Sequence, residues 1–243
     1  MRLTAAVVTS SIGRPTLRRA IESVAAQSVP ARHYVFAHGR EFWEKTAAIA
    51  QDYPSVEFVK LPNNNGSNGY CMAPVFAAAP YIVSEDVIFY LDDDNWYESE
   101  HIERALDLIS KHDLGWAFSL RNIVSDSGEH ICVDTCESLG YFKNVFGSHL
   151  VDNSCYCVRT EIARRTSWAW YQPVTADRNF LKALLDLKIP AGCTGVPTVN
   201  YRLSLDGSQA MSPAAFVLGN QEISKTYGES PPWREPSFVK FSF

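Results

Sequence analysis

Four short apolar runs in the N-terminal part of the chain place the strongest constraint on its fold. Each has the length and the β-branched or aromatic content of a strand buried inside a sheet. Stretches with apolar residues at helical spacing, such as Leu17, Ala20, Ile21 and Val24, lie between them. This alternation predicts an α/β fold of the Rossmann-like kind, with a mainly parallel sheet flanked by helices. The runs are Leu3 to Ser10, Tyr34 to Ala37, Val56 to Leu61 and Val87 to Leu91.

The rest of the chain is less regular but extends the same unit. A hairpin is expected from Trp116 to Thr135 because a polar turn separates two apolar runs. A strand at Ser154 to Val158 precedes helices at Asp177 to Leu187 and Ala214 to Thr226. A length of 243 residues suits one domain, residues 1–243. The segment 229–243 is too apolar for a free tail, so we expect it to dock on this chain or on a second copy, which would make a homo-oligomer.

Charge and hydropathy narrow the classes of partner. The formal net charge of -5 gives no general attraction to nucleic acid or to an anionic membrane. No apolar run approaches the ~20 residues of a membrane span, and the N-terminus lacks the long apolar segment of a signal peptide. A cytoplasmic protein without an integral membrane segment is therefore expected. The six cysteines have spacings that match no common zinc pattern, and they are interpreted as reduced core thiols.

Three adjacent carboxylates, Asp92, Asp93 and Asp94, directly follow the fourth apolar run. Ligands of parallel sheets bind beyond the carboxyl ends of the strands, so these side chains should share a crevice with Ser10 and His38. Carboxylate oxygens suit Mg²⁺ or Mn²⁺, either of which bridges a diphosphate well. The triplet alone leaves a second interpretation open, a solvated turn that caps a helix starting near Glu98.

Five short motifs follow one another along the chain: residues 7–24, Asn64-Asn65-Gly66, Tyr90 to Tyr97, Thr175 to Phe180 and Asn200 to Leu203. Their order resembles that of the family 2 glycosyltransferases, which are inverting enzymes with a GT-A fold. Residues 7–24 are similar to the opening strand, turn and Arg/Leu-rich helix of that family. Tyr90 to Tyr97 resembles its D-x-D motif, and Asn64-Asn65-Gly66 resembles its Asn-x-Gly loop. Thr175 to Phe180 lies where the family carries an acidic pair before a helix, and Asn200 to Leu203 is similar to the segment that follows. The resemblance covers most of residues 4–205.

This resemblance implies a reaction and a role for each candidate residue. A hexose would move, with inversion, from a nucleotide diphosphate sugar, most often a UDP-sugar, to a hydroxyl of an acceptor whose class the sequence leaves open. Asp94 and Asp92 would hold Mn²⁺ or Mg²⁺, and Asp177 would be the general base. Residues 1–97 would bind the nucleotide sugar and residues 98–228 the acceptor. The donor contacts would be Ser10, Ser11, Gly13, Arg14, His38, Asn64, Asn65, Gly66, Asp92 and Asp93, and the acceptor contacts Trp96, Asp152, Asn153, Trp170 and Tyr171.

Departures from the family pattern leave two other functions open. Ala37 and His38 stand where the family often has an acidic pair, and Ala176 precedes Asp177 in place of a second acid. A non-catalytic sugar-nucleotide or carbohydrate-binding protein is therefore one alternative. The other is a nucleotidyltransferase, although enzymes of that class carry a Gly-rich basic loop where residues 10–14 have one Gly and one Arg. The aromatic candidates also suit a core, and Asp177 also suits the first turn of a helix.

Overall fold

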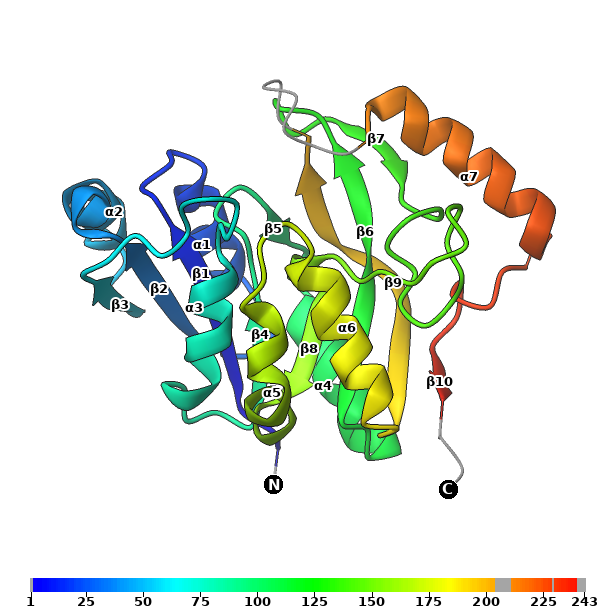
Figure 1. Cartoon of the computed structure of the whole chain (residues 1–243), viewed down its shortest axis with the longest axis horizontal. Coiled ribbons are helices and arrows are strands. Elements are labelled where there is room, and N and C mark those ends of the chain that lie inside the picture. The colour runs from blue at the N-terminus through cyan, green and yellow to red at the C-terminus, as the bar shows by residue number, and fades with distance from the viewer. Residues whose placement is uncertain (1, 204–210, 229, 240–243) are drawn as a thin grey trace.

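One mixed sheet forms the centre of the computed structural model, which describes residues 2–203, 211–228 and 230–239 (Figure 1). The strand order is β10-β9-β6-β8-β4-β1-β2-β3, with β5 paired to β9 and β7 paired to β6. The strands are β1 (Ala5–Ser11), β2 (Arg32–His38), β3 (Val56–Leu61), β4 (Val87–Tyr90), β5 (Trp96–Tyr97), β6 (Trp116–Val124), β7 (His130–Val133), β8 (Tyr156–Arg159), β9 (Ala191–Arg202) and β10 (Ser237–Val239).

Parallel pairing dominates the half of the sheet that ends in the polar motifs. Strand β1 pairs in parallel with β2 and β4, and β2 pairs in parallel with β3. Strand β8 runs antiparallel between β4 and β6, and β6 pairs in parallel with β9. The predicted fold class, a mainly parallel α/β sheet flanked by helices, is confirmed.

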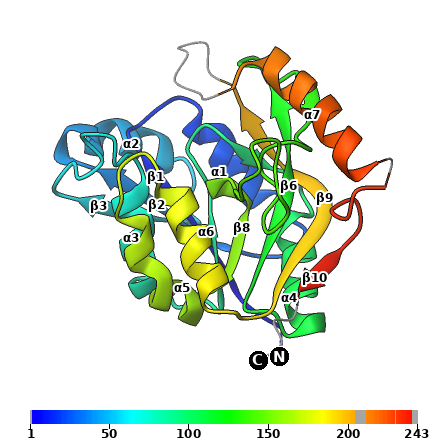
Figure 2. The ribbon, with the colours of Figure 1, turned by 45° about the vertical axis from the view of Figure 1, so that its right-hand side comes forward.

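Helices cover both faces of the sheet. In Figure 1, helices α3, α5 and α6 lie in front of the sheet and α4 lies behind it. Figure 2 shows α7 beside the upper ends of β6 and β9. The α-helices are α1 (Leu17–Ala25), α2 (Trp43–Ala50), α3 (Ala73–Ala78), α4 (His101–His112), α5 (Thr160–Thr166), α6 (Ala176–Asp186) and α7 (Pro213–Tyr227). Short 3₁₀ turns are η1 (Arg40–Phe42), η2 (Ala79–Tyr81), η3 (Asn153–Cys155) and η4 (Ser167–Trp170).

The central strands are buried on both faces, so the polar residues that follow them lie at the edge of the core. Every residue of β4 is buried, as is Leu91 after it. Tyr90 packs between Phe76 of α3 and Trp170 of η4, with ring centroids 4.8 and 5.1 Å away. A strand anchored in this way places the next polar residues, Asp92 to Asp94, at the edge of the core.

The structure differs from the sequence expectation most at β9. This twelve-residue strand was not expected, because Gly192, Gly195 and Pro197 interrupt its apolar pattern. Register shifts in the β6–β9 pair accommodate the irregular residues. The short β5 and β10, which both pair with β9, were not expected either.

The C-terminal segment packs on its own chain where it is described. Strand β10 adds to the sheet edge, and Trp233 is fully buried beside Phe142 and Tyr227. Residues 229 and 240–243 of the predicted docking tail lie outside the described residues. Across the described chain, every helix is too short or too polar to cross a membrane.

Candidate active site at the strand ends

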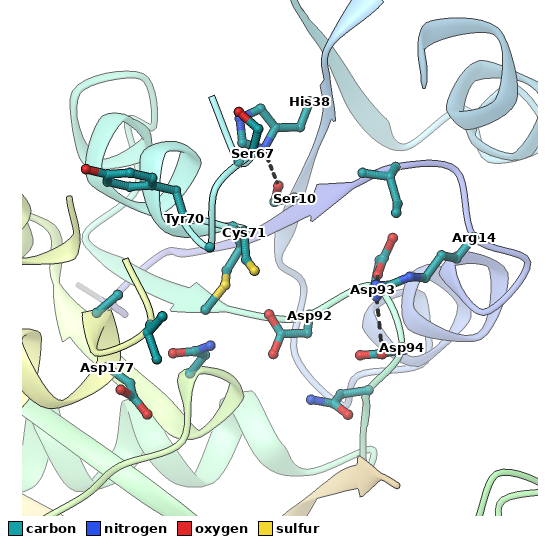
Figure 3. Close-up of a pocket in the computed structure, with 18 of the residues that line it drawn as sticks. Ser10, Arg14, His38, Ser67, Tyr70, Cys71, Asp92, Asp93, Asp94 and Asp177 are labelled. Atoms are coloured by element: carbon teal, nitrogen blue, oxygen red, sulfur yellow. Dashed lines mark hydrogen bonds and ion pairs between the residues drawn. The ribbon is translucent and has the colours of Figure 1, made fainter. Parts of the chain in front are cut away.

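A cavity of about 660 Å³ opens where β1, β2 and β4 end, and we call it the strand-end cavity (Figure 3). This volume suits a ligand of sugar-nucleotide size. Five aspartates and two arginines are among the residues that line it. The lining residues are Ser10, Ile12, Arg14, His38, Phe42, Asn64, Gly66, Ser67, Gly69, Tyr70, Cys71, Met72, Asp92, Asp93, Asp94, Asn95, Asp152, Asn153, Val174, Ala176, Asp177, Tyr201 and Arg202.

Asp93 is the structural member of the acidic triplet. It is 3% exposed, accepts a hydrogen bond from the Ser11 hydroxyl at 2.8 Å, and pairs with the Arg14 guanidinium at 3.0 Å. Arg14 also reaches Asp94 at 3.3 Å. These contacts lock the turn after β1 to the turn after β4, so Asp93 stabilises the cavity wall rather than offering a free carboxylate.

Asp92 and Asp94 are half-buried and offer carboxylates to the cavity. Figure 3 shows Asp92 between Asp177 on one side and the Arg14–Asp93–Asp94 group on the other. Burial, followed by the charges of Asp152, Asp94 and Asp93, raises the pKa of Asp92 well above its usual range. Burial and the charge of Asp93 also raise the pKa of Asp94, against the opposing effects of Arg14 and Arg202. The neighbouring arginines therefore do not fully offset the effects of burial and mutual repulsion on these two carboxyl groups.

The residues of this wall fit a divalent cation. Asp92 and Asp94 supply hard oxygen ligands, and a cation beside them would relieve their mutual repulsion. Among the described residues, the structure brings together no group of three or more His, Cys, Asp or Glu side chains that could hold a metal. Two protein carboxylates, completed by phosphate oxygens and water, match the way Mg²⁺ is commonly held in nucleotide sites.

Ser10 and His38 form the opposite wall, at the ends of β1 and β2. The Ser10 hydroxyl lies 3.3 Å from His38 Nδ1, and His38 is 2% exposed. Burial lowers the pKa of His38, against a smaller opposing effect of Glu41. Gly66 must be glycine here, because a Cβ would come within 2.4 Å of the Cys71 carbonyl oxygen and 3.0 Å of the His38 ring.

Asp177 enters the cavity from the first turn of α6. Its carboxylate accepts a hydrogen bond from the Arg178 backbone amide at 2.7 Å, and its side chain is 23% exposed. Burial raises the pKa of Asp177 in spite of the Arg178 amide and guanidinium, which favour the charged form. The effect of burial on the Asp177 pKa is therefore larger than the opposing effect of the helix N-terminus. The pKa moves toward the range of a general base.

Two aromatic residues expected at the acceptor side belong to the protein interior. Trp170 is fully buried and stacks on Phe180 with ring centroids 4.3 Å apart, so it has no surface to offer a ligand. Trp96 is 8% exposed in β5, and the Arg19 guanidinium covers its ring at 3.3 Å. Tyr171 is 55% exposed and packs against Tyr70, a residue that lines the cavity.

Three residues expected at the donor lie outside the cavity lining. Ser11 is 1% exposed, and its hydroxyl donates a hydrogen bond to Asp93. Gly13 faces α2, where a Cβ would come within 2.5 Å of Lys45. Asn65 is exposed beside the two lining residues of its loop, Asn64 and Gly66. Ser11 and Gly13 therefore stabilise the turn after β1, while a donor contact for Asn65 stays a prediction.

Several lining residues were not singled out from the sequence. Three of them come shortly after the Asn-x-Gly loop, namely Tyr70, Cys71 and Met72. Their nearness to that loop in the sequence is the signal that could have indicated their place in the cavity. Arg202, at the end of β9, lies 4.0 Å from Asp94 and also pairs with Asp126 of the β6–β7 turn. The cysteines are free; Cys136, Cys155, Cys157 and Cys193 are buried, Cys132 is half-buried, and Cys71 is exposed.

Comparison with known proteins agrees with this geometry. Residues 6–156 match glycosyl transferase family 2. An uncharacterized protein of Haemophilus influenzae is 38% identical over 115 residues, which cover 40% of this chain and 77% of that protein. Residues 1–349 of S. aureus TarS, solved in complex with UDP-GlcNAc, superpose with a TM-score of 0.62 at 15% identity, over 91% of this chain and 67% of that one. The UDP complex of the same TarS region gives 0.61 at 13% identity, over 94% and 73%.

The parallel sheet with an acidic cavity at its strand ends defines an α/β domain of the GT-A type. The chain belongs to glycosyl transferase family 2 and is a glycosyltransferase.

Proposed function

We propose that this glycosyltransferase moves a hexose from a UDP-sugar to an acceptor hydroxyl, with inversion and with help from a divalent cation. The observation that carries the proposal is the placement of Asp92, Asp94 and Asp177 around one cavity. A leaving diphosphate beside Asp92 and Asp94, with a base across the cavity, puts the two groups on opposite sides of the anomeric carbon. That arrangement favours direct displacement with inversion.

The donor lies between the two walls in this proposal. Ser10, His38, Asn64 and Gly66 face the nucleotide, and Asp92 faces the ribose and diphosphate. Likeness to TarS, which was solved with UDP-GlcNAc, supports UDP as the nucleotide. Arg14 already pairs with Asp93 and Asp94, and its side chain is half exposed, so it also lies in reach of phosphate oxygens.

Asp94 and Asp92 are the residues that would hold Mn²⁺ or Mg²⁺. Bound there, the cation counters the negative charge that grows on the departing diphosphate. In the transfer step, Asp177 takes the proton of the acceptor hydroxyl as its oxygen bonds to the anomeric carbon. The bond from that carbon to the diphosphate oxygen breaks, and the diphosphate leaves with the electron pair.

The acceptor enters beside Tyr70 and Tyr171 in this account. Their rings lie 5.0 Å apart next to Val174, which is 81% exposed and lines the cavity before Asp177. The exposed Tyr171 ring and the half-buried Tyr70 ring offer an apolar surface that keeps water from the reacting hydroxyl. Asn153 and Asp152 on η3 and its flank supply polar contacts.

A panel of UDP-sugars, incubated with and without Mn²⁺, tests this function. We expect cation-dependent release of UDP from one sugar class, and NMR of the first product should show an inverted anomeric centre. In Asp94→Ala the cation-dependent part of UDP binding should disappear, because the diphosphate loses its counter-charge. Full activity in EDTA, or a product with retained configuration, would refute the proposal.

A further inference from the structure

Arg121 of β6 is a buried cation that the proposed reaction does not use. It is 2% exposed, and each guanidinium nitrogen pairs with a different carboxylate. The distances are 2.9 Å from Nε to Asp134, 2.5 Å from Nη2 to Glu137 and 2.6 Å from Nη1 to Asp152. The ring of Tyr201 covers the guanidinium at 4.2 Å. Such an arrangement engages a planar fork of donors that lysine cannot reproduce.

The three carboxylates stand at the two ends of one irregular segment, residues 134–152, which we call the β7–η3 loop. Asp134 and Glu137 open the loop, and Asp152 closes it. Asp134 also accepts hydrogen bonds from the backbone amides of Cys136, Glu137 and Ser138. The Asp152 amide in turn donates to the Ser138 hydroxyl at 2.9 Å. Arg121 therefore ties the start of the loop to its end.

Hydrogen bonds connect the C-terminal end of the loop to the acidic triplet. Asp152 accepts a hydrogen bond from the Ser154 amide at 3.0 Å. The Ser154 hydroxyl then accepts from the Asp92 backbone amide at 3.3 Å and from the Asn95 amide group at 3.0 Å. A continuous chain of contacts thus runs from Arg121, through Asp152 and Ser154, to the Asp92 backbone amide and the Asn95 side chain, which flank Asp93 and Asp94.

Two cavity-lining side chains also depend on Arg121. Asp152 and Tyr201 line the strand-end cavity, and both contact the guanidinium from inside the protein. Arg121 itself is outside the lining, so it has no route to a bound donor or acceptor. Its influence on a ligand must pass through the residues it holds.

We propose that Arg121 is a positioning residue, the clasp that closes the β7–η3 loop and thereby sets the backbone of Asp92 to Asn95 for cation and diphosphate binding. The ligand-binding part of this inference rests on the proposed function. Residues that orient metal ligands in this indirect way typically change metal affinity by about 10–100-fold when they are replaced. A residue that only stabilised the fold would lower the folded fraction and leave the binding constants of the folded protein unchanged.

The test compares two clasp variants with a matched control. Arg121→Lys keeps the charge but not the three-way contact, and Asp134→Asn weakens the clasp at the end of the loop remote from Asp92. Thr198→Val is the control, because it removes a buried hydrogen bond elsewhere in the sheet, 2.8 Å between Thr198 Oγ1 of β9 and His101 Nδ1, and neither residue lines the cavity. For each folded variant, hydrogen exchange and the half-saturating Mn²⁺ concentration for UDP binding are measured.

In Arg121→Lys we expect faster exchange in residues 134–154 and also in residues 92–95, with half-saturating Mn²⁺ raised about 10–100-fold. Asp134→Asn should give the same pattern, and it decides the question alone if Arg121→Lys does not fold. Thr198→Val should leave exchange at 92–95 and the Mn²⁺ dependence unchanged. Faster exchange confined to the loop, with normal Mn²⁺ dependence, would overturn the inference.

The two proposals fail in distinguishable ways. If the wild-type protein shows no Mn²⁺-dependent UDP binding, the proposed function fails, and exchange at residues 92–95 alone then decides the positioning role. If wild-type binding is normal and the clasp variants bind as the wild type does, the positioning role fails and the proposed function stands.

Discussion

Ser10 and His38, which end two neighbouring parallel strands, meet through a hydrogen bond of 3.3 Å between the Ser10 hydroxyl and His38 Nδ1. This bond leaves the other ring nitrogen, Nε2, buried and, within the described residues, without a hydrogen-bond partner. His38 lines the strand-end cavity, so this unpaired nitrogen is a candidate hydrogen-bond partner for a bound ligand. Burial lowers the pKa of His38, which keeps the ring neutral near pH 7.

We expect His38→Phe to weaken UDP binding about 3- to 10-fold, the contribution of one neutral hydrogen bond. Phenylalanine fills similar space without a ring nitrogen, so the change isolates the polar contact. Isothermal titration with UDP at fixed Mn²⁺ measures it. Because the wild-type ring stays neutral, affinity should vary little between pH 7 and pH 8. Unchanged affinity in His38→Phe would remove His38 from the donor site.

Tyr171 and Trp168 form a matched pair for testing the acceptor side. Both are exposed aromatic residues, 55% and 68%, but Tyr171 packs on cavity-lining Tyr70, whereas Trp168 is on η4 away from the lining. Tyr171→Ala should raise the acceptor KM about 5-fold or more, with donor hydrolysis unchanged, because stacking area is lost. Steady-state kinetics with the acceptor identified by product analysis measures it. An equal effect of Trp168→Ala would contradict the assignment.

Two buried histidines make stability depend on pH. Burial lowers the pKa of both His33 and His101 to about 3, while the unfolded chain has its ordinary value near 6.5. The unfolded state therefore binds more protons below pH 6.5, and the contribution of each neutral ring to the free energy of unfolding is lost as pH falls toward 3. Carboxylates whose pKa burial raises, such as Asp177, act in the opposite direction.

A single variant isolates this effect. His33→Gln keeps a polar partner for Thr9, which bonds to His33 at 2.9 Å, but removes one titrating ring. Between pH 6 and pH 5 its unfolding free energy should fall less steeply than that of the wild type, by about 1.4 kcal/mol per pH unit at most. Urea unfolding at several pH values measures the two slopes, and identical slopes would mean that His33 is not buried as a neutral ring.

The first four strands were predictable because each one is a compact apolar run with a polar turn after it. Burial on both faces explains that pattern, as in β4, where every residue is inside. The acidic triplet after β4 was found because the ends of parallel strands meet at one edge of a sheet, whereas the Asn-x-Gly loop was found through its resemblance to the family motif. Asp177 was singled out because Thr175 to Phe180 resembles the family's acidic motif before a helix, and the structure places it in the cavity lining.

Other features depend on distant contacts that sequence order does not reveal. Strand β9 is irregular in composition, and its length follows from pairing with β6. Trp170 looks like a surface aromatic next to Tyr171, yet it packs on Phe180 from another helix. Arg121 is separated by 13 to 31 positions from the three carboxylates it binds, so only folding brings the clasp together.

The central claim is that Asp177 is the base opposite the Asp92–Asp94 wall. The direct measurement is the turnover number of Asp177→Asn, with UDP and Mn²⁺ affinity measured on the same preparation. Asparagine keeps the size of the side chain but takes no proton, so we expect kcat to fall by about 10²–10⁴-fold with affinity for UDP and Mn²⁺ unchanged. A turnover number close to that of the wild type would contradict the account.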